Sequence, residues 1–197
     1  MTFVKHLFAA IAGAVLAFSA PAFAGDKDNA SSIADEIGLK VGETVPAIEA
    51  RGADGTKVKF EELVGENGIV LVFVRSIDWC PFCKNQMVAL DEIAPELNAK
   101  GYPIVALSYD SPKDQNKFLA KRDLSFKMVS DQESEVIKAF GLLNTEYKEG
   151  SRPYGVPHPT IYVISKDGEI KGKLMEQGFR RRPEPEMLVE LVNSVAQ

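Results

Sequence analysis

The stretch Ile69–Met87, IVLVFVRSIDWCPFCKNQM, decides the fold of this chain. It begins with six apolar, mostly β-branched residues, Ile69 to Val74, and a short run of this kind is typical of a buried strand. A polar turn follows, and then a helical pattern that opens with Cys80 and Pro81 and carries Cys83 three residues after Cys80. Pro81 suits the first position of a helix, because its missing N–H would be unpaired there in any case.

The pattern places Cys80 where the exposed turn meets the first helical turn, with Cys83 one turn inside. The N-terminus of a helix carries partial positive charge and unpaired N–H groups, and both stabilise a thiolate. Such a thiol can have its pKa lowered from about 8.5 into the range of roughly 3.5 to 7.5. Because residues three apart share a helical face, the two thiols can close a small, reducible disulfide. The pattern therefore predicts thiol–disulfide exchange in which Cys80 attacks and Cys83 resolves.

Two other interpretations use the same pair, which are the only cysteines of the chain. An inert structural disulfide would close a loop of so few residues that it would stabilise the fold very little. A zinc site needs four ligands, and the sequence holds no second cysteine pair. The position of the pair between a strand and a helix, in a β-α-β pattern, favours redox chemistry.

The first 24 residues are typical of a secretory signal peptide. Lys5 and His6 form a short positive region, Leu7 to Phe18 is apolar, and Ala22-Phe23-Ala24 is a cleavage pattern. The apolar run is shorter than the ~20 residues that a membrane-spanning helix needs, which disfavours an uncleaved anchor and stable membrane association. We expect an exported protein, periplasmic or secreted, in an oxidising compartment where a partner must reduce the two cysteines.

Composition limits the classes of partner. Removal of 24 of the 197 residues leaves 173, which suits one domain, and we expect a signal peptide over 1–24, a polar tether over 25–40 and a domain over 41–197. Without Lys5 the chain has 22 basic and 28 acidic residues, a net charge of −6. This balance argues against nucleic-acid binding. We interpret the single basic run, Arg180–Arg182, as a solvated loop.

Strand and helix patterns alternate through the rest of the domain. Strands are predicted over 41–50, 56–60, 69–74, 103–108, 126–129, 160–164 and 169–175, and helices over 84–99, 111–122, 133–140 and 184–195. The central part has the order β-α-β-α-β-α, followed by a hairpin and a closing helix. This order predicts an α/β fold with a mixed central sheet and helices on both faces.

Four parts of the chain resemble the alkyl hydroperoxide reductase / thiol-specific antioxidant (AhpC/TSA) family, the peroxiredoxin-like redoxins of the thioredoxin-fold superfamily. They are VGETVP at 41–46, FVRSIDWCPFCKNQM at 73–87, LSYDSPKDQNKF with FKMVSD at 107–131, and GVPHPTIYVISKDGEI at 155–170. The resemblance covers about 41–195. It implies a thioredoxin-like fold and an antioxidant thiol chemistry that uses no cofactor.

The chain departs from typical peroxiredoxins at three places. That family carries a proline seven residues and a threonine or serine three residues before the peroxidatic cysteine, where this chain has Phe73 and Ile77. It also carries an arginine just before the strand that matches Ile161 to Ile164, where this chain has Pro159. The groups that bind peroxide in the family are therefore not recognisable, and we expect disulfide exchange ahead of peroxide reduction.

The segment before that strand is similar to thioredoxin instead. Pro159, followed by Thr160, matches the thioredoxin cis-proline, whose cis bond turns the backbone to pair with a bound disulfide partner. His158 would then lie close to the Cys80 sulfur, where it could stabilise the thiolate or move its proton; the alternative is an exposed loop histidine. Trp79 is expected to form a flat rim beside the thiol.

The expected function is an exported thiol–disulfide oxidoreductase with an antioxidant role. Its substrate would be a thiol or disulfide of a protein, or a hydroperoxide, and an unidentified reductant would restore it. One alternative is a thiol-dependent peroxidase. Another is a copper(I) carrier that uses Cys80, Cys83 and His158, since thiolates and imidazole suit copper(I), although the copper chaperones of this fold have a Cys-x-x-x-Cys spacing. A third is a structural module with an idle disulfide.

Overall fold

The structure is a computed structural model that describes residues 36–176, 178 and 180–196. The predicted signal peptide, 1–24, and residues 25–35 of the predicted tether lie outside the described residues. The elements are β1 (Glu49–Arg51), β2 (Lys57–Lys59), α2 (Phe60–Leu63), β3 (Gly68–Phe73), α3 (Pro81–Ala99), β4 (Ile104–Ser108), α4 (Pro112–Arg122), β5 (Lys127–Ser130), α5 (Glu135–Ala139), β6 (Thr160–Ser165), β7 (Ile170–Met175) and α6 (Pro185–Val195).

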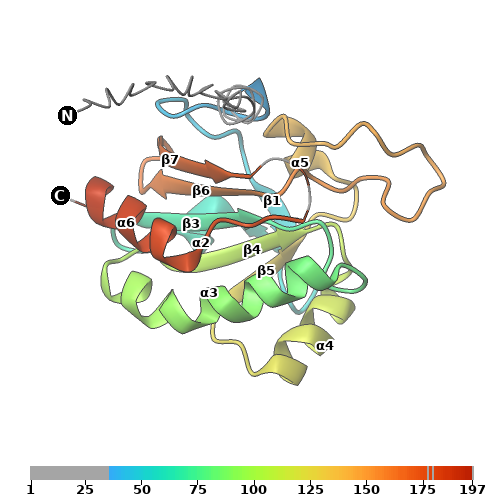
Figure 1. The fold of residues 1–197 in the computed structure, drawn as a ribbon, viewed down its shortest axis with the longest axis horizontal. Helices are drawn as coiled ribbons and strands as arrows, with labels where there is room; N and C mark the ends of the chain where they lie inside the picture. Colours follow the sequence, from blue (N-terminus) through green and yellow to red (C-terminus); the bar gives the residue numbers. More distant parts are fainter. Residues whose placement is uncertain (1–35, 177, 179, 197) are drawn as a thin grey trace, which may run out of the picture.

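A seven-stranded mixed sheet forms the centre of the molecule, in the order β2-β1-β5-β4-β3-β6-β7 (Figure 1). The three central strands β5, β4 and β3 are parallel, and β6 and β7 follow β3 as an antiparallel pair. This is the mixed sheet that the alternating pattern predicts. Val70 of β3 pairs with Ile104 of β4 on one side and with Val163 of β6 on the other.

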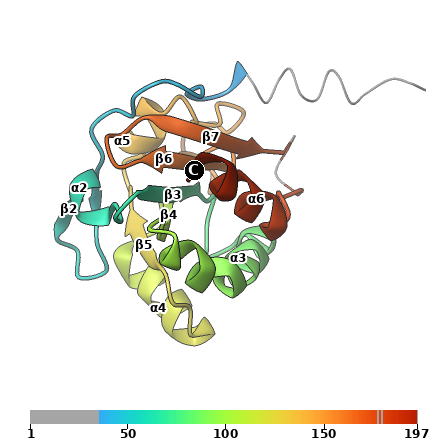
Figure 2. The same ribbon diagram turned by 90° about the vertical axis from the view of Figure 1, so that its left-hand side faces the viewer.

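Helices cover both faces of the sheet, with α3, α4 and α6 on one side and α2 and α5 on the other (Figure 2). All six residues of β3 are buried, and alternate ones face opposite cores. Val70 and Val72 contact the core that includes the apolar side of α3 and α6, whereas Leu71 and Phe73 contact the core around α5. A continuous apolar run is therefore what a central strand with two covered faces requires.

The first predicted strand is the element that differs most from expectation. Only Glu49 to Arg51 joins the sheet. Gly42 and Val45 instead donate backbone hydrogen bonds to the carbonyls of Ile170 and Gly168 in the β6–β7 hairpin. Val45 and Ile48 still pack on the core around α5, because burial needs contact with the core but not a strand ladder, whereas Val41 is exposed.

The end of the predicted tether packs against the domain. The backbone N–H of Leu39 donates to the carbonyl of Phe140 at 3.1 Å, and the Tyr162 hydroxyl donates to the Leu39 carbonyl at 3.1 Å. Gly38 has a φ of +75°, and a Cβ there would lie 2.5 Å from Leu142. Within the described part of the chain, no helix is both long and apolar enough to cross a membrane.

Candidate active site

The helix that follows the central strand begins as the sequence predicts. Cys80 is the N-cap of α3 with extended backbone angles, and Pro81 occupies the first helical position. The backbone N–H of Cys83 donates to the Cys80 sulfur at 3.4 Å. One of the unpaired N–H groups of the helix N-terminus is thereby directed at the Cys80 thiol, which favours its thiolate.

Both thiols are free and both are buried. Cys80 is 2% exposed and Cys83 is 0% exposed, so the expectation that Cys80 lies on an exposed turn is wrong. The reason is that Cys80 faces the sheet, where it belongs to the apolar core beneath α3. Next to it Pro81 and Phe82 are exposed and Trp79 is half-buried, so the solvent boundary lies immediately beside Cys80.

A positive charge contacts the second thiol. The Arg182 guanidinium lies against Cys83, with Nη2 donating to the sulfur at 3.2 Å, and its Nε donates to Gln86 Oε1 at 2.8 Å. The interpretation of Arg180–Arg182 as a solvated loop is thus correct for the exposed Arg180 and Arg181 but wrong for Arg182. The described residues just before α6 lie against the first turns of α3, where Arg182 contacts Cys83 and Gln86.

The ionisations of the two thiols are linked, because each thiol affects the pKa of the other. The pKa of Cys83 is lowered to about 6, first because the Cys80 thiol donates a hydrogen bond to it and then because of Arg182, while burial opposes the shift. The pKa of Cys80 is raised, because its proton is held in that same hydrogen bond and because of burial. The prediction that the helix N-terminus lowers the pKa of Cys80 is therefore wrong: the hydrogen bond from the Cys83 N–H does lower it, but these two effects are larger, and Cys83 is the thiol whose pKa is lowered. In a coupled pair of this kind the first ionisation belongs to both groups. The single remaining proton can therefore pass from Cys80 to Cys83 when Cys80 attacks.

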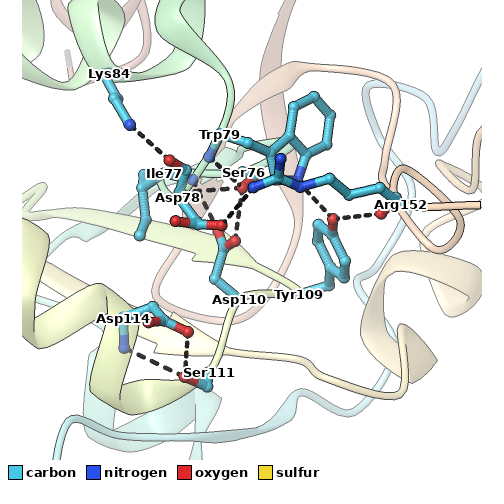
Figure 3. A network of polar contacts seen from close by, with 10 residues as sticks. All are labelled: Ser76, Ile77, Asp78, Trp79, Lys84, Tyr109, Asp110, Ser111, Asp114 and Arg152. Carbon is cyan, nitrogen blue, oxygen red and sulfur yellow. Dashed lines mark hydrogen bonds and ion pairs between the residues drawn. The ribbon is translucent and has the colours of Figure 1, made fainter.

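Polar and aromatic groups hold the indole ring of Trp79, the residue before Cys80, in place (Figure 3). Its indole Nε1 donates to the Tyr109 hydroxyl at 2.8 Å, and that hydroxyl donates to the Arg152 carbonyl at 2.9 Å. The guanidinium groups of Arg75 and Arg152 lie 5.3 and 5.9 Å from the centre of the indole ring, within the range of cation–π attraction. These contacts fix the indole ring and join it to the long loop that carries Arg152; the role of Trp79 as a rim beside the thiol stays a prediction.

The turn before Cys80 is held by a buried carboxylate. Asp110, two residues after the end of β4, accepts hydrogen bonds from Ser76 Oγ at 2.6 Å and from the Ile77 N–H at 2.8 Å (Figure 3). It also accepts one from Ser108 Oγ at 2.7 Å. Burial raises the pKa of Asp110, and these hydrogen bonds oppose the shift. Because Asp110 is reached across the sheet rather than along the chain, it fixes the cysteine turn relative to β4.

Asp78 and Lys84, two charged residues near Cys80, form contacts with groups other than the Cys80 sulfur. Asp78 forms an ion pair with Arg152 at 2.9 Å, and its backbone carbonyl accepts a hydrogen bond from Lys84 Nζ at 2.6 Å (Figure 3). The N-cap of α3 is the Cys80 thiol itself. The side chain that caps this helix is therefore the reactive thiol and not the Asp78 carboxylate.

The segment before β6 differs from the thioredoxin-like expectation. None of the described peptide bonds is cis, so the prediction of a cis bond before Pro159 is wrong. Pro157 bridges to Leu143 and the His158 N–H donates to the Leu142 carbonyl at 2.7 Å. The chain is therefore already extended where it enters β6. An extended chain accommodates a trans His158–Pro159 peptide bond, and the trans form of an X–Pro bond is favoured by about 0.5–1 kcal/mol.

The same segment still ends beside the cysteine motif. Thr160 pairs with Phe73, the last residue of β3, and its hydroxyl donates to the His158 carbonyl at 3.0 Å. The His158 imidazole, however, forms no hydrogen bond with either sulfur in the described structure. Burial lowers the pKa of His158, with Glu146 and Arg75 as the charges that act on it. The structure therefore brings Pro159 and Thr160 to the correct end of the sheet but does not join His158 to Cys80.

The copper alternative requires three ligands on one ion. Across residues 36–176, 178 and 180–196 no group of three or more His, Cys, Asp and Glu side chains is arranged to hold a metal. Cys80, Cys83 and His158 are consequently not gathered as that hypothesis needs.

A thiol pair at the N-terminus of the helix that follows a central strand, with an acceptor for its proton already in contact, defines a thiol oxidoreductase built on a thioredoxin-like fold. Comparison of the sequence with protein families narrows this class. The AhpC/TSA family model matches residues 41–173, and the chain belongs to the AhpC/TSA family. The resemblance deduced from the four sequence stretches is confirmed.

Individual relatives represent two kinds of redox enzyme. Thiol-disulfide oxidoreductase ResA of Bacillus thuringiensis subsp. konkukian (strain 97-27) is 29% identical over 140 residues, which cover 68% of this chain and 72% of ResA. Peroxiredoxin Bcp of Escherichia coli (strain K12) is 26% identical over 133 residues, which cover 68% of this chain and 83% of Bcp. The crystal structure of peroxidoxin BcpB from Mycobacterium tuberculosis matches with a TM-score of 0.68 at 22% identity, over 80% of this chain and 98% of that one. The thioredoxin-like fold is confirmed, and the protein is an oxidoreductase.

Proposed function

We propose that the protein is an exported thiol–disulfide oxidoreductase with an antioxidant role, and that Cys80 and Cys83 form its redox-active pair. Reduced Cys80 attacks a disulfide of a protein substrate and forms a mixed disulfide with one of its sulfurs. Cys83 then attacks Cys80 Sγ, which releases the reduced substrate and leaves the Cys80–Cys83 disulfide. A reductant partner restores the pair.

The observation that carries this proposal is the arrangement of the two sulfurs. Cys80 Sγ accepts the Cys83 N–H at the helix N-terminus, which stabilises negative charge on the attacking atom. The pKa of the neighbouring Cys83 thiol is lowered while that of Cys80 is raised, so the Cys83 thiolate can take the Cys80 proton. Nucleophile, proton acceptor and resolving thiol are thus present in two residues. An inert disulfide would need none of these features.

The peroxidase alternative lacks comparable support at the positions where the family places its peroxide-binding groups. Ile77 has no side-chain donor, and its backbone N–H is already bonded to Asp110. The neighbouring Ser76 hydroxyl also donates to Asp110. Pro159 cannot supply the cation of the family arginine. Disulfide exchange needs none of these donors, and the site supports it better.

The test of the proposed function is turnover of a protein disulfide. We expect the reduced protein, supplied with dithiothreitol, to catalyse the reduction of insulin disulfides, with turbidity of the released chains as the readout. A variant in which both cysteines are serine is the matched control and should give only the background rate of dithiothreitol. If the wild-type protein gives no more than this background with insulin and other unfolded disulfide proteins, the proposed function is wrong.

Export gives an independent prediction. Because Ala22-Phe23-Ala24 ends a complete signal pattern, we expect signal peptidase to cut before Gly25 in an exporting bacterial host. N-terminal sequencing of protein recovered from the periplasm or medium should begin at Gly25. A replacement of Ala24 by Arg is expected to leave the precursor uncut. Recovery of exported protein with Met1 intact would contradict the prediction.

A further inference from the structure

The two-thiol mechanism leaves the Arg182 contact unused. Several acceptors hold the guanidinium in place: its Nε donates to Gln86 Oε1 at 2.8 Å, its Nη2 to Cys83 Sγ at 3.2 Å and its Nη1 to the Arg181 backbone carbonyl at 2.6 Å. Gln86 lies three residues after Cys83 on the same face of α3 and is only 7% exposed. The Gln86 side chain thus orients the guanidinium, so that Nη2 points at Cys83 Sγ rather than into solvent.

We propose that Arg182 stabilises the thiolate that Cys83 becomes when the Cys80–Cys83 disulfide is reduced, and so makes that disulfide a better electron acceptor. This inference rests on the proposed function and specifies which step Arg182 assists. It assigns Arg182 to the resolving sulfur, which is the leaving group of the re-reduction step, and not to the attacking sulfur.

The step balances with a dithiol as the reductant. One thiolate of the dithiol attacks Cys80 Sγ and forms a mixed disulfide, while the Cys80–Cys83 bond breaks and its electron pair goes to Cys83 Sγ. The second thiol of the dithiol then attacks the first sulfur of the dithiol, which is bonded to Cys80 Sγ. This closes the disulfide of the reductant and releases Cys80 as a thiol. The dithiol becomes a disulfide, and the cysteine pair gains two electrons. Of the two protons released by the dithiol, one stays between Cys80 and Cys83 and the other goes to solvent.

The burial of Cys83 makes the charge of Arg182 effective. A thiolate at a position with 0% exposure is disfavoured unless charge or hydrogen bonds compensate it. The groups that face the Cys83 sulfur are the Cys80 thiol, the Ser76 backbone and Arg182, and together they lower the pKa of Cys83 to about 6 against the effect of burial. Among them the guanidinium supplies a full positive charge that persists at every working pH.

The effect of Arg182 differs between the two redox states. In the oxidised protein Cys83 is neutral, and the guanidinium gains little from it. In the reduced protein the guanidinium makes a charge-assisted hydrogen bond, which is stronger than a neutral one. Loss of the positive charge therefore destabilises the reduced pair more than the disulfide, and the reduction potential becomes more negative.

The experiment is a redox equilibrium of the purified mature protein. Wild type, Arg182→Met, Arg182→Lys and Arg181→Met are equilibrated at pH 7 with dithiothreitol buffers of known ratio, and the reduced fraction is measured by thiol alkylation. We expect the equilibrium constant for reduction to fall about tenfold in Arg182→Met, a shift of about −30 mV for a two-electron couple. Arg182→Lys, which keeps the charge, should recover part of the loss.

Arg181 provides the matched control. It is the exposed neighbour of Arg182, and its backbone carbonyl, which a side-chain replacement leaves in place, accepts a hydrogen bond from Arg182. Arg181→Met removes the same formal charge one residue away and should change the equilibrium constant by less than twofold. The thiolate absorbance near 240 nm gives a second readout: its first rise with pH should move to higher pH in Arg182→Met but not in Arg181→Met.

Two outcomes would overturn the inference. One is a folded Arg182→Met with the wild-type equilibrium constant, and the other is an equal shift in Arg181→Met. If Arg182→Met fails to fold, Gln86→Met replaces it, because it removes only the acceptor that orients the guanidinium; a fall of about threefold supports the inference and no change opposes it. The equilibrium needs no biological substrate, so failure of this inference is distinguishable from failure of insulin reduction by the wild-type protein.

Discussion

Replacement of Cys80 by serine is expected to lower the rate of disulfide reduction at least about a thousandfold, equivalent to roughly 4 kcal/mol of activation free energy. The physical reason is that Cys80 has the helix N–H directed at its sulfur and lies beside the solvent boundary, whereas Cys83 has no exposed surface. The lowered pKa of Cys83 does not compensate, because a thiolate must also reach the substrate sulfur. Cys80→Ser should therefore retain an ionisable but unreactive thiol.

Replacement of Cys83 by serine should have a different result. Attack by Cys80 is retained, but the mixed disulfide with substrate cannot be resolved and accumulates. Mass spectrometry of Cys83→Ser, incubated with a protein disulfide, should show one substrate chain attached to Cys80 per protein molecule. The double serine variant should show no adduct. Adducts on Cys83 in the Cys80→Ser protein, formed at the wild-type rate, would reverse the two roles.

The features that the sequence could predict are those that depend on residues close together along the chain. The β-branched run before the motif, Pro81 at the first helical position and the three-residue spacing of the cysteines together predicted the strand, the helix start and the contact between the thiols. Each of these depends on neighbours along the chain, and each is present in the structure. The fold followed from the order of such local elements, because parallel strands joined by helices leave few possible topologies.

The parts that sequence missed are contacts between distant segments. Arg182 reaches Cys83 across 99 positions, and Arg152 reaches Asp78 across 74. Nothing in the pattern RRRP distinguishes its third arginine, since the choice depends on how the chain crosses α3 after β7. Asp110 lies in a stretch that carried the family resemblance, yet its hydrogen bonds to the cysteine turn appear only when β4 is placed beside β3.

The expectation for the segment before β6 was wrong for a related reason. A proline next to a strand matched the thioredoxin pattern, but the geometry of its peptide bond depends on what the preceding residues bind. Here the His158 N–H and Pro157 are already paired with Leu142 and Leu143, which extends the chain before Pro159. A local pattern could not reveal this pairing.

Reduction of a protein disulfide is expected to be at least tenfold faster than reduction of hydrogen peroxide or an alkyl hydroperoxide, on a per-thiol basis. In the transition state of peroxide reduction negative charge develops on the leaving oxygen, and fast peroxidases stabilise it with preorganised donors. At the positions where the family places those donors this chain has Ile77 and Pro159. The Cys80 thiolate alone would give only the slow reaction of any thiolate with peroxide.

Stopped-flow mixing of the reduced protein with the three oxidants measures this comparison directly. A peroxide that reacts about tenfold faster than the disulfide, a difference of about 1.4 kcal/mol in activation free energy, would contradict the prediction and show that another donor acts. Arg75 would be the first to test, because its buried guanidinium lies 5.3 Å from the Trp79 ring and donates to the Tyr147 hydroxyl at 2.8 Å. Arg75→Met and His158→Gln would then identify the donor, since only the variant that lacks it should lose the fast peroxide reaction while keeping disulfide exchange.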